Sequence, residues 1–301
     1  MAVHGLDRAA APEAAKARAM LDEIHGTWWN VYIGGPRSKG SGWTPDRVRQ
    51  YEAQGITRFL LIYVGRQGGD VPLLTTSQGR QDGDEACQIA ARFGYDAAGT
   101  PICLDLEGAT FDKSEQGSLN YARGWCHAVR AQGLRPGVYS NPRALIPLAR
   151  DDGPDWVWVA AWVSNKVDPN ADPHRIPHHL ADDLWANAGQ RAWQYAGRIR
   201  NEPATVGGLE VDINVADDGC LVGTGHPTEG TTGPGSDTST GGWDEMATKE
   251  EIKDAVREVL REELKVVIQG DPNTEDGGAH PHNLRNINRT ATAIKQKVDA
   301  D

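Results

Sequence analysis

Short apolar runs separated by longer polar stretches recur along the first 221 residues. The runs are rich in Val, Ile, Leu and aromatic residues, which favours β-strands, and the stretches between them have helical length. The runs predict strands at residues 3–7, 28–33, 58–64, 102–106, 135–139, 156–162, 192–195 and 210–215. This alternation predicts an α/β fold for residues 1–221, a (β/α)8 TIM-like barrel near the lower end of its size range.

Several of the intervening stretches carry helix start and stop signals. Thr44, followed by Pro45, predicts an N-cap with proline at the first helical position. Gly55, Gly94 and Gly133 each predict a helix end before the next strand. A doubly wound open sheet is the alternative, but the Gly-x-Gly-x-x-Gly phosphate loop of that fold does not follow the first predicted strand.

The composition changes abruptly after Leu221. Residues 222–243 consist mainly of Gly, Thr, Ser and Pro, which predicts a flexible linker. Residues 244–301 contain many Glu, Lys and Leu residues at helical spacing. The sequence therefore predicts three parts, which are a barrel, a linker and a short helical C-terminal segment.

The C-terminal segment contains two helical patterns. Apolar residues recur at every fourth position over 252–264, behind a capping box formed by Thr248 and Glu251. Over 284–298 the apolar spacing alternates between three and four, which indicates a coiled-coil seam of about two heptads. A surface helix packed on its own domain is the alternative. With a coiled coil, we expect this segment to form homo-oligomers or to attach the barrel to other proteins.

Charge, cysteine content and hydropathy exclude several classes of protein. The net charge of −11 argues against a nucleic-acid partner, because phosphate binding needs a concentrated basic surface. The four cysteines are far apart and form no Cys-x-x-Cys motif, so we expect buried thiols rather than disulfides or a zinc site. No apolar run reaches the ~20 residues of a membrane span. The N-terminal residues lack the basic and apolar regions of a signal peptide, so no export signal is expected.

Four carboxylates lie at the ends of predicted strands. Asp7 ends the first, Asp105 and Glu107 end the fourth, and Asp212 lies on the eighth. Residues i and i+2 of a strand face the same side, about 6–7 Å apart, so Asp105 and Glu107 are expected to point into the barrel mouth together. The first and eighth strands of a closed barrel are neighbours, which places Asp7 and Asp212 on the opposite wall.

A pocket of this kind suits acid–base chemistry. Crowded, desolvated carboxyls raise one another's pKa, so one can donate a proton near neutral pH. Glycosidic cleavage needs one protonated carboxyl and one carboxylate beside the oxocarbenium-like centre. A single Asp at a strand end often only caps a loop. Asp105 and Glu107, however, follow apolar strand residues, where two charges reduce stability unless the site uses them.

Aromatic residues near the strand ends suggest a sugar ligand, because their flat faces can stack on pyranose rings. The candidate substrate-binding residues are Tyr32, Tyr63, Tyr139, Trp162, Trp193 and Tyr195. Core packing is the competing explanation for each of them, because aromatic residues in strands are often buried.

Other chemistries find less support. His174, His178 and His179 lie in a proline-rich segment and are better explained as exposed loop residues than as metal ligands, so no metal site is predicted. No Gly-x-Ser-x-Gly elbow is present. Cys126 and His127 are adjacent on a predicted helix and so point in different directions.

Six motifs in order along the barrel region resemble a known family. They are Gly5-Leu-Asp7, Asp105-Leu-Glu107, Gly137-Val-Tyr-Ser140, Trp158-Val-Ala-Ala-Trp162, Trp193-Gln-Tyr195 and Val211-Asp-Ile-Asn214. Over about residues 3–221, the sequence resembles the Chalaropsis-type lysozymes of glycoside hydrolase family 25. It resembles more closely the glycoside-hydrolase-like domain of actinobacterial secreted proteins and of phages of those bacteria.

This resemblance implies a cofactor-free barrel that hydrolyses the β-1,4 bond between N-acetylmuramic acid and N-acetylglucosamine in peptidoglycan. It assigns Glu107 as the general acid. Asp105 would orient the N-acetyl group of the substrate or stabilise the positive centre, and Asp7 and Asp212 would act as stabiliser or nucleophile. Whether the nucleophile is an enzyme carboxylate or the substrate's own acetamido group remains open at this point.

Three functional hypotheses follow. The first is a peptidoglycan glycosidase, the second a module that binds cell-wall glycan without cutting it, and the third a structural virion protein. The linker and helical segment resemble those of phage proteins that meet the cell wall. We therefore expect a tail-associated protein of the virion, with tail proteins as partners of residues 244–301, or an endolysin released to the host cell wall.

Overall fold

The computed structural model describes residues 2–38, 42–67, 69–148, 153–176 and 189–223. The predicted helical segment at 244–301 and most of the predicted linker at 222–243 lie outside the described residues. Val222, the first residue of that predicted linker, pairs with Phe59 through two backbone hydrogen bonds and is buried.

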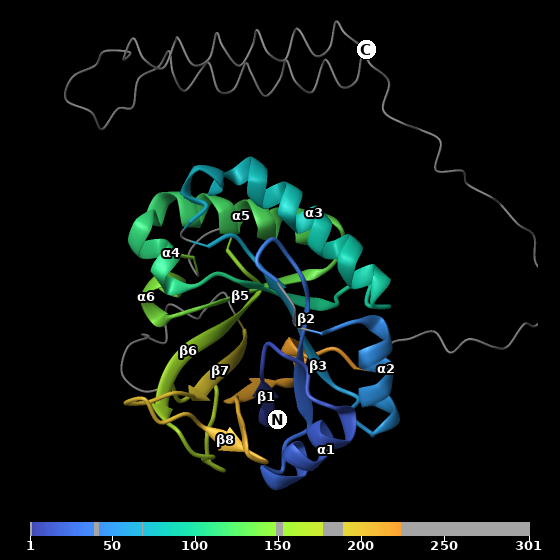
Figure 1. Cartoon of the computed structure of the whole chain (residues 1–301). Coiled ribbons are helices and arrows are strands. Elements are labelled where there is room, and N and C mark those ends of the chain that lie inside the picture. The colour runs from blue at the N-terminus through green and yellow to red at the C-terminus, as the bar shows by residue number, and fades with distance from the viewer. Residues whose placement is uncertain (1, 39–41, 68, 149–152, 177–188, 224–301) are drawn as a thin grey trace, which may run out of the picture. The chain divides into compact units, whose positions relative to one another are not determined.

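The strands close into a barrel, which confirms the predicted TIM-like fold (Figure 1). They follow the order β1-β2-β3-β4-β5-β6-β7-β10, and β10 pairs with β1. Their bounds are β1 (Ala2–Asp7), β2 (Trp28–Gly34), β3 (Phe59–Val64), β4 (Pro101–Asp105), β5 (Arg135–Ser140), β6 (Trp156–Ser164), β7 (Gln190–Ala196) and β10 (Asp212–Asp217).

The last strand departs from the predicted βα order. A hairpin of β8 (Thr205–Val206) and β9 (Leu209–Glu210) stands between β7 and β10 in the chain, where the sequence suggested a helix. Gly207 and Gly208 form its turn at φ +56° and +77°, which glycine adopts without strain. The predicted strand at 210–215 is therefore divided between β9 and β10. Because the hairpin reverses the chain, β10 runs antiparallel to both neighbours.

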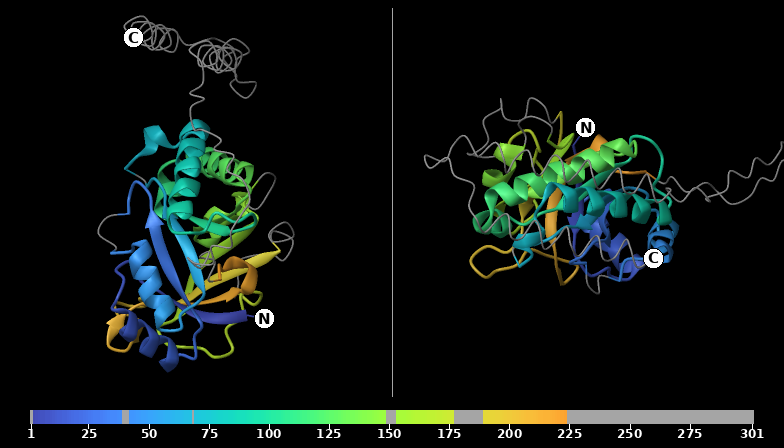
Figure 2. Two further views of the ribbon diagram at one scale, coloured as in Figure 1. Left: turned by 90° about the vertical axis from the view of Figure 1, so that its right-hand side faces the viewer. Right: turned by 90° about the horizontal axis from the view of Figure 1, so that it is seen from above.

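The helices pack against the outside of the barrel strands. They are α1 (Ala14–Glu23), α2 (Pro45–Ala53), α3 (Thr76–Arg92), α4 (Gly108–Lys113), α5 (Glu115–Ala131) and α6 (Pro142–Leu148), with 3-10 turns at Val71–Leu73 and Asp218–Cys220. α3 and α5 lie side by side (Figures 1 and 2). The Thr44 hydroxyl accepts a hydrogen bond from the Arg47 amide, as the predicted N-cap requires. Gly55, Gly94 and Gly133 follow helix ends at positive φ, as predicted.

Two apolar layers hold the fold together. The barrel interior contains Trp28 and Trp156, and a larger layer lies between the strands and the helices. The indole rings of Trp28 and Trp156 lie against Gly5 and Gly137, where a Cβ atom would come within 2.1 Å of the ring. These two glycines therefore allow large side chains to fill a narrow barrel.

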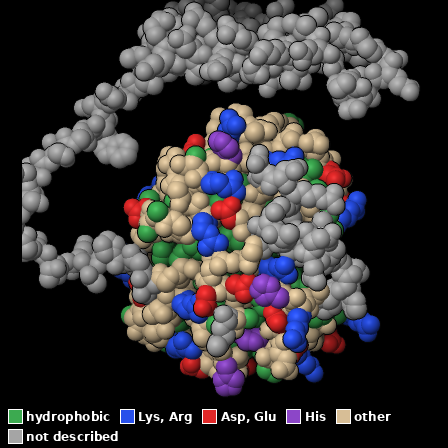
Figure 3. Space-filling view, turned by 180° about the vertical axis from the view of Figure 1, so that it is seen from behind, with side chains coloured by type: hydrophobic (Ala, Val, Ile, Leu, Met, Phe, Trp, Pro, Cys, Tyr) green, Lys and Arg blue, Asp and Glu red, His purple; other side chains and the backbone are tan. Residues whose placement is uncertain are grey.

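The outer surface is mixed in charge. On the face in Figure 3, acidic and basic side chains of the described residues are interspersed, without a continuous basic surface. Within the described part of the chain, no helix combines the length and the apolarity that crossing a bilayer requires.

Candidate active site

Four carboxyl side chains meet in one pocket at the barrel mouth. Asp7 ends β1, Asp105 ends β4, Glu107 follows two residues later, and Asp212 begins β10. The pocket has a volume of about 240 Å³. Its lining consists of Asp7, Tyr32, Asp105, Glu107, Tyr139, Trp158, Trp162, Gln194 and Asp212.

Asp212 reaches the mouth because β10 runs antiparallel. In a parallel eighth strand, a residue at the strand start would lie at the opposite end of the barrel from the other acids. Here the register pairs Asp7, the last residue of β1, directly with Asp212, the first residue of β10. The sequence placed both residues on one wall correctly, but it did not predict the strand direction that brings them together.

Gln194 of β7 connects the acidic wall to the aromatic wall. Its side-chain nitrogen donates hydrogen bonds to Asp7 Oδ2 at 2.9 Å and Asp212 Oδ2 at 3.3 Å. Its side-chain oxygen accepts from the Tyr139 hydroxyl and from Trp162 Nε1, each at 2.9 Å. The amide thus uses both its donors and both acceptor positions, which fixes the relative positions of four pocket residues.

Burial makes Asp7 and Asp212 weak acids. Desolvation, followed by the charge of Asp212, raises the pKa of Asp7 well above its ordinary value. Hydrogen bonds from the Tyr32 hydroxyl, at 3.1 Å, and from Gln194 oppose this rise. Burial and the charges of Glu210 and Glu107 raise the pKa of Asp212 to about 7. The pair therefore favours one negative charge near neutral pH over two.

Asp105 and Glu107 have a different environment. The Asp105 side chain is 9% exposed, and its Oδ1 atom has no hydrogen-bond partner. Burial and the charge of Glu107 raise the pKa of Asp105 to about 8. Glu107 is more exposed, and its partial burial raises its pKa. Asp105 thus offers an unused polar atom to a ligand, and Glu107 stands above it with access to solvent.

The β3–α3 loop supports the turn that carries Glu107. The side-chain oxygen of Gln67 accepts from the Glu107 amide at 3.3 Å and from the Thr110 hydroxyl at 3.0 Å. The preceding residue, Arg66, forms an ion pair with Asp82 at 2.9 Å, and Asp82 is only 3% exposed. Gln67 therefore holds the start of α4 from a loop that is itself anchored to α3.

Three of the six predicted aromatic residues line the pocket. Tyr32 and Tyr139 are half-buried on its wall, and Trp162 stands at the rim with 44% of its surface exposed. Trp158 lies buried beneath them, with its ring centroid 4.5 Å from that of Tyr139. Trp162 is therefore the aromatic pocket residue most accessible to a sugar ring.

The other three aromatic residues do not reach the pocket. Tyr63, Trp193 and Tyr195 are buried in the layer outside the barrel. The Tyr63 hydroxyl donates to Glu85 of α3 at 2.6 Å, and Trp193 Nε1 donates to the Ala161 carbonyl at 2.9 Å. Successive residues of a strand face opposite sides of the sheet, so the residues next to these three aromatic residues face the barrel interior.

The sequence analysis missed two pocket residues, Gln194 and Trp158. Both residues could have been found from the alternation of inward-facing and outward-facing residues along a strand. Gln194 shares the inward face of β7 with Ala192, and Trp158 shares the inward face of β6 with Trp156. In β7 the aromatic residues Trp193 and Tyr195 face outward, so the residue between them, Gln194, faces inward.

His174, the described histidine of the histidine-rich segment, lies apart from this pocket. His174 Nε2 lies 2.9 Å from Asp217, at the end of β10 away from the mouth. His178 and His179 are outside the described residues. No group of three or more His, Cys, Asp or Glu side chains suited to a metal ion occurs in the described part of the chain.

Comparison with solved structures gives three matches, of which the first supports the fold. An uncharacterized B. stearothermophilus protein matches with a TM-score of 0.53 and 17% identity, over 73% of this chain and 100% of that one. The modular autolysin LytC from Streptococcus pneumoniae matches with a TM-score of 0.43 and 14% identity, over 72% of this chain and 47% of its own. The Clostridium perfringens spore cortex lytic enzyme SleM matches with a TM-score of 0.45 and 15% identity, over 72% of this chain and 67% of its own.

Sequence comparison identifies the family. A search of curated proteins gave no match. The family model described as "Rv2525c-like, glycoside hydrolase-like domain" matches residues 27–216, which include β2 to β7 and nearly all of β10. The chain therefore belongs to the Rv2525c-like, glycoside hydrolase-like domain family.

Proposed function

We propose that this protein is a lysozyme-like glycoside hydrolase that cleaves bacterial cell-wall peptidoglycan between N-acetylmuramic acid and N-acetylglucosamine. The observation that carries this proposal is the gathering of four carboxyl groups with raised pKa values in one aromatic-rimmed pocket. Glycosidases need both a proton donor and an ionised carboxylate around the scissile bond. Membership of a glycoside hydrolase-like family agrees with this proposal.

Glu107 is the proposed general acid. It is the most exposed carboxyl of the pocket, so it can reach the leaving oxygen of a long glycan, and its raised pKa keeps more of it protonated near neutral pH. Asp105, buried below it with a free oxygen, is the proposed partner for the amide N–H or a hydroxyl of the sugar.

Asp7 and Asp212 form the opposite wall in this mechanism. When one of the two carboxyls is protonated, one negative charge remains on the other to stabilise the oxocarbenium-like centre. Asp212, with a pKa of about 7, is the member that ionises more readily. Attack at the sugar carbon then comes either from this carboxylate or from the substrate's acetamido oxygen.

The direct test is release of reducing sugar from purified peptidoglycan, with cosedimentation of the protein measured in parallel. We expect soluble reducing ends to accumulate with the wild-type protein and to fall to background with Glu107→Gln, while both proteins cosediment equally. Absence of release and of cosedimentation would contradict any role on this polymer.

A glycan-binding module without turnover is the second candidate. Its supporting observation is that burial raises the pKa of all four carboxyls, to about 8 at Asp105 and about 7 at Asp212, so the pocket carries less negative charge than four ordinary carboxylates would. Cosedimentation without release, equal in wild type and Glu107→Gln, would favour this candidate.

We further propose that the protein works on the host wall as a phage tail-associated protein or as an endolysin. This proposal rests on the sequence of residues 222–301 alone. Sedimentation of the full chain should show oligomers if the segment at 244–301 assembles as a coiled coil. A monomer at all concentrations would remove the support for a tail component.

A further inference from the structure

Residues 65–67, which we call the 65–67 loop, bind the backbone of both Asp105 and Glu107. The Gly65 amide donates to the Asp105 carbonyl at 3.0 Å, and the Gln67 side-chain oxygen accepts from the Glu107 amide at 3.3 Å. A Cβ atom at Gly65 would come within 2.6 Å of the Leu104 side chain, so the absence of a side chain lets the loop lie this close to β4. The position of this loop therefore affects both residues that carry the carboxyl groups of this wall.

Arg66, the middle residue of the 65–67 loop, is anchored to α3 and α5. Its Nη2 atom donates to Asp82 Oδ1 at 3.1 Å, and its Nε atom lies 2.9 Å from Asp82 Oδ2. Its backbone amide donates to the Tyr121 hydroxyl at 3.4 Å. The two helices thus hold both the side chain and the backbone of Arg66, and with them the start and end of the loop.

Asp82 is itself fixed on all sides. Besides its contacts with Arg66, its Oδ1 atom accepts from Gln78 Nε2 and its Oδ2 atom accepts from the Tyr121 hydroxyl, each at 2.7 Å. Asp82 and Tyr121 are both buried. The helices approach closely at Gly79, where a Cβ atom would come within 2.1 Å of the Tyr121 carbonyl oxygen. The carboxylate therefore has one defined position between α3 and α5, and the guanidinium of Arg66 is defined with it.

Stability alone does not explain a buried ion pair of this kind. Removing two charges from water offsets most of their mutual attraction, and apolar residues of similar size are often equally stable. An ion pair does fix direction, because its charge-assisted hydrogen bonds are satisfied in few arrangements. The Arg66–Asp82 pair is therefore suited to holding the 65–67 loop in one place against β4.

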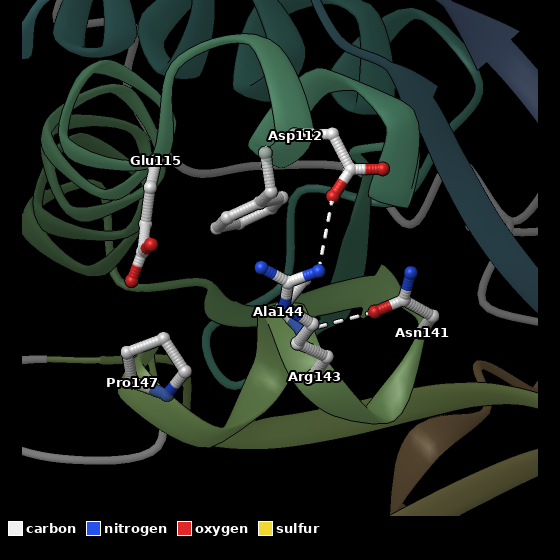
Figure 4. Close-up of a pocket in the computed structure, with 7 residues that line it drawn as sticks. Asp112, Glu115, Asn141, Arg143, Ala144 and Pro147 are labelled. Atoms are coloured by element: carbon white, nitrogen blue, oxygen red, sulfur yellow. Dashed lines mark hydrogen bonds and ion pairs between the residues drawn. The ribbon is translucent and has the colours of Figure 1, made fainter.

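Two ion pairs near the same turn are more exposed. On the other side of α4, Arg143 lies 3.4 Å from Asp112, beside a cavity of about 30 Å³ between α4 and α6 (Figure 4). The Arg143 side chain is 85% exposed, so water and salt weaken this attraction. Asp70 accepts a hydrogen bond from the Gln67 amide at 3.4 Å, but its ion-pair partner, Arg37, is exposed. Neither pair is shielded from solvent as the buried pair is.

We infer that Asp82, through Arg66 and Gln67, holds Glu107 in the position from which it acts. This inference rests on the proposed function and adds a positioning residue to it. A proton donor must lie within hydrogen-bond reach of the leaving oxygen, and a displacement of about 1 Å can lower the rate severely. Asp82 is not one of the described residues that line the pocket, so it acts on turnover only through the loop.

Steady-state kinetics of the full chain on a soluble glycan tests this connection with Asp82→Asn, Gln67→Ala and the double variant. We expect each single variant to lower kcat about fivefold with KM unchanged. The double variant should also lose about fivefold, because both residues act on Glu107 through one path, whereas independent effects would multiply to about 25-fold. Arg66→Gln should match Asp82→Asn, and Arg66→Lys should retain part of the rate.

Hydrogen–deuterium exchange of the full chain gives a second measurement that needs no turnover. Because Gln67 holds the Glu107 amide, peptides that contain this amide should exchange about fivefold faster in Asp82→Asn, while peptides from β10 should exchange as in the wild type. Arg143→Gln, which removes the exposed ion pair on the other side of α4, is the matched control. It should change neither kcat nor exchange at Glu107. Circular dichroism checks the fold of each variant.

The outcomes distinguish this inference from the proposed function. Unchanged exchange at Glu107 in both Asp82→Asn and Arg66→Gln would overturn the inference, whether or not the protein cleaves glycan. An increase in exchange throughout the barrel, a raised KM, or a 25-fold loss in the double variant would also contradict it. If the wild type shows no turnover, the glycosidase proposal fails, and the exchange result alone decides whether Asp82 positions Glu107.

Discussion

The acidic wall at Asp7 and Asp212 is built across two antiparallel strands, whereas Asp105 and Glu107 follow one another at the end of a single strand. The first pair is tied by Gln194, and Asp7 also accepts a hydrogen bond from Tyr32. In the second pair, Asp105 Oδ1 has no hydrogen-bond partner. The two pairs of carboxyl groups thus differ in how many of their oxygen atoms accept hydrogen bonds from the protein.

This difference distinguishes a wall whose polar atoms the fold already holds in place from a wall whose polar atoms are open to a ligand. Buried polar atoms are normally hydrogen-bonded, because an unpaired one reduces stability by about 1–3 kcal/mol. The Asp7–Asp212 wall meets this rule within the fold and acts as a fixed surface. In the Asp105–Glu107 wall, Asp105 Oδ1 lacks a hydrogen-bond partner, as expected where a substrate supplies that partner.

The largest effect is expected from Glu107→Gln. Loss of a general acid typically lowers turnover about 10²–10⁴-fold, and the amide cannot donate the required proton. Asp212→Asn should lower kcat by a smaller factor, because Asp7 can still carry the negative charge. Steady-state kinetics on a soluble glycan measures both, with Glu115→Gln as the control. Equal losses in the two variants would contradict the division of roles between the walls.

Much of this site could be read from the sequence, because strand ends in a barrel converge at one mouth. The positions of Asp7, Asp105 and Glu107 followed from two apolar runs, one ending at Asp7 and the other leading into Asp105 and Glu107. The direction of β10 could not be predicted, because an apolar run does not reveal which way its strand runs. The hairpin before β10 has strands of only two residues and a Gly-Gly turn, which is a weak sequence signal. The aromatic predictions at Tyr63, Trp193 and Tyr195 ignored strand alternation.

Gln194→Met should have the next largest effect, on stability. Methionine has a similar length but no hydrogen-bonding groups, so Asp7, Tyr139 and Trp162 each lose a partner. We expect the free energy of unfolding in urea to fall by about 3 kcal/mol. Gln190→Met, on the same strand at the opposite end, is the control. A loss no larger than that of the control would mean that the network contributes little.

Asp105→Asn should change how stability depends on pH. The folded pKa of about 8 lies above the unfolded value, so the folded state keeps a proton that the unfolded state loses. The stability of the wild type therefore falls as pH rises from about 4 to about 8, by roughly 1 kcal/mol per unit from this group. The Asp105→Asn variant lacks this loss. Its free energy of unfolding relative to that of the wild type should therefore rise by about 2 kcal/mol when the pH is raised from 5 to 7.

Urea unfolding at the two pH values measures this change. Asp112→Asn, which alters a largely exposed carboxylate, serves as the control. If wild type and Asp105→Asn respond to pH identically, the Asp105 carboxyl is not protonated in the folded protein at neutral pH.

The smallest effect is expected at Gln67, which acts through Glu107. Gln67→Ala removes the acceptor of the Glu107 amide and should lower kcat about fivefold with KM unchanged. Gln67→Glu keeps an acceptor oxygen and should restore part of the rate. Its added negative charge should move the basic limb of the pH profile to higher pH by raising the pKa of Glu107. An unchanged profile together with a raised KM would indicate a contact with substrate instead.

The most direct test of the central claim is the identity of the new reducing ends. Peptidoglycan digested with the full chain would be reduced with borohydride, and the fragments analysed by mass spectrometry. We predict fragments ending in reduced N-acetylmuramic acid, which are absent when Glu107→Gln replaces the wild-type protein. Fragments ending in reduced N-acetylglucosamine, or no new reducing ends although the protein binds the polymer, would contradict the account.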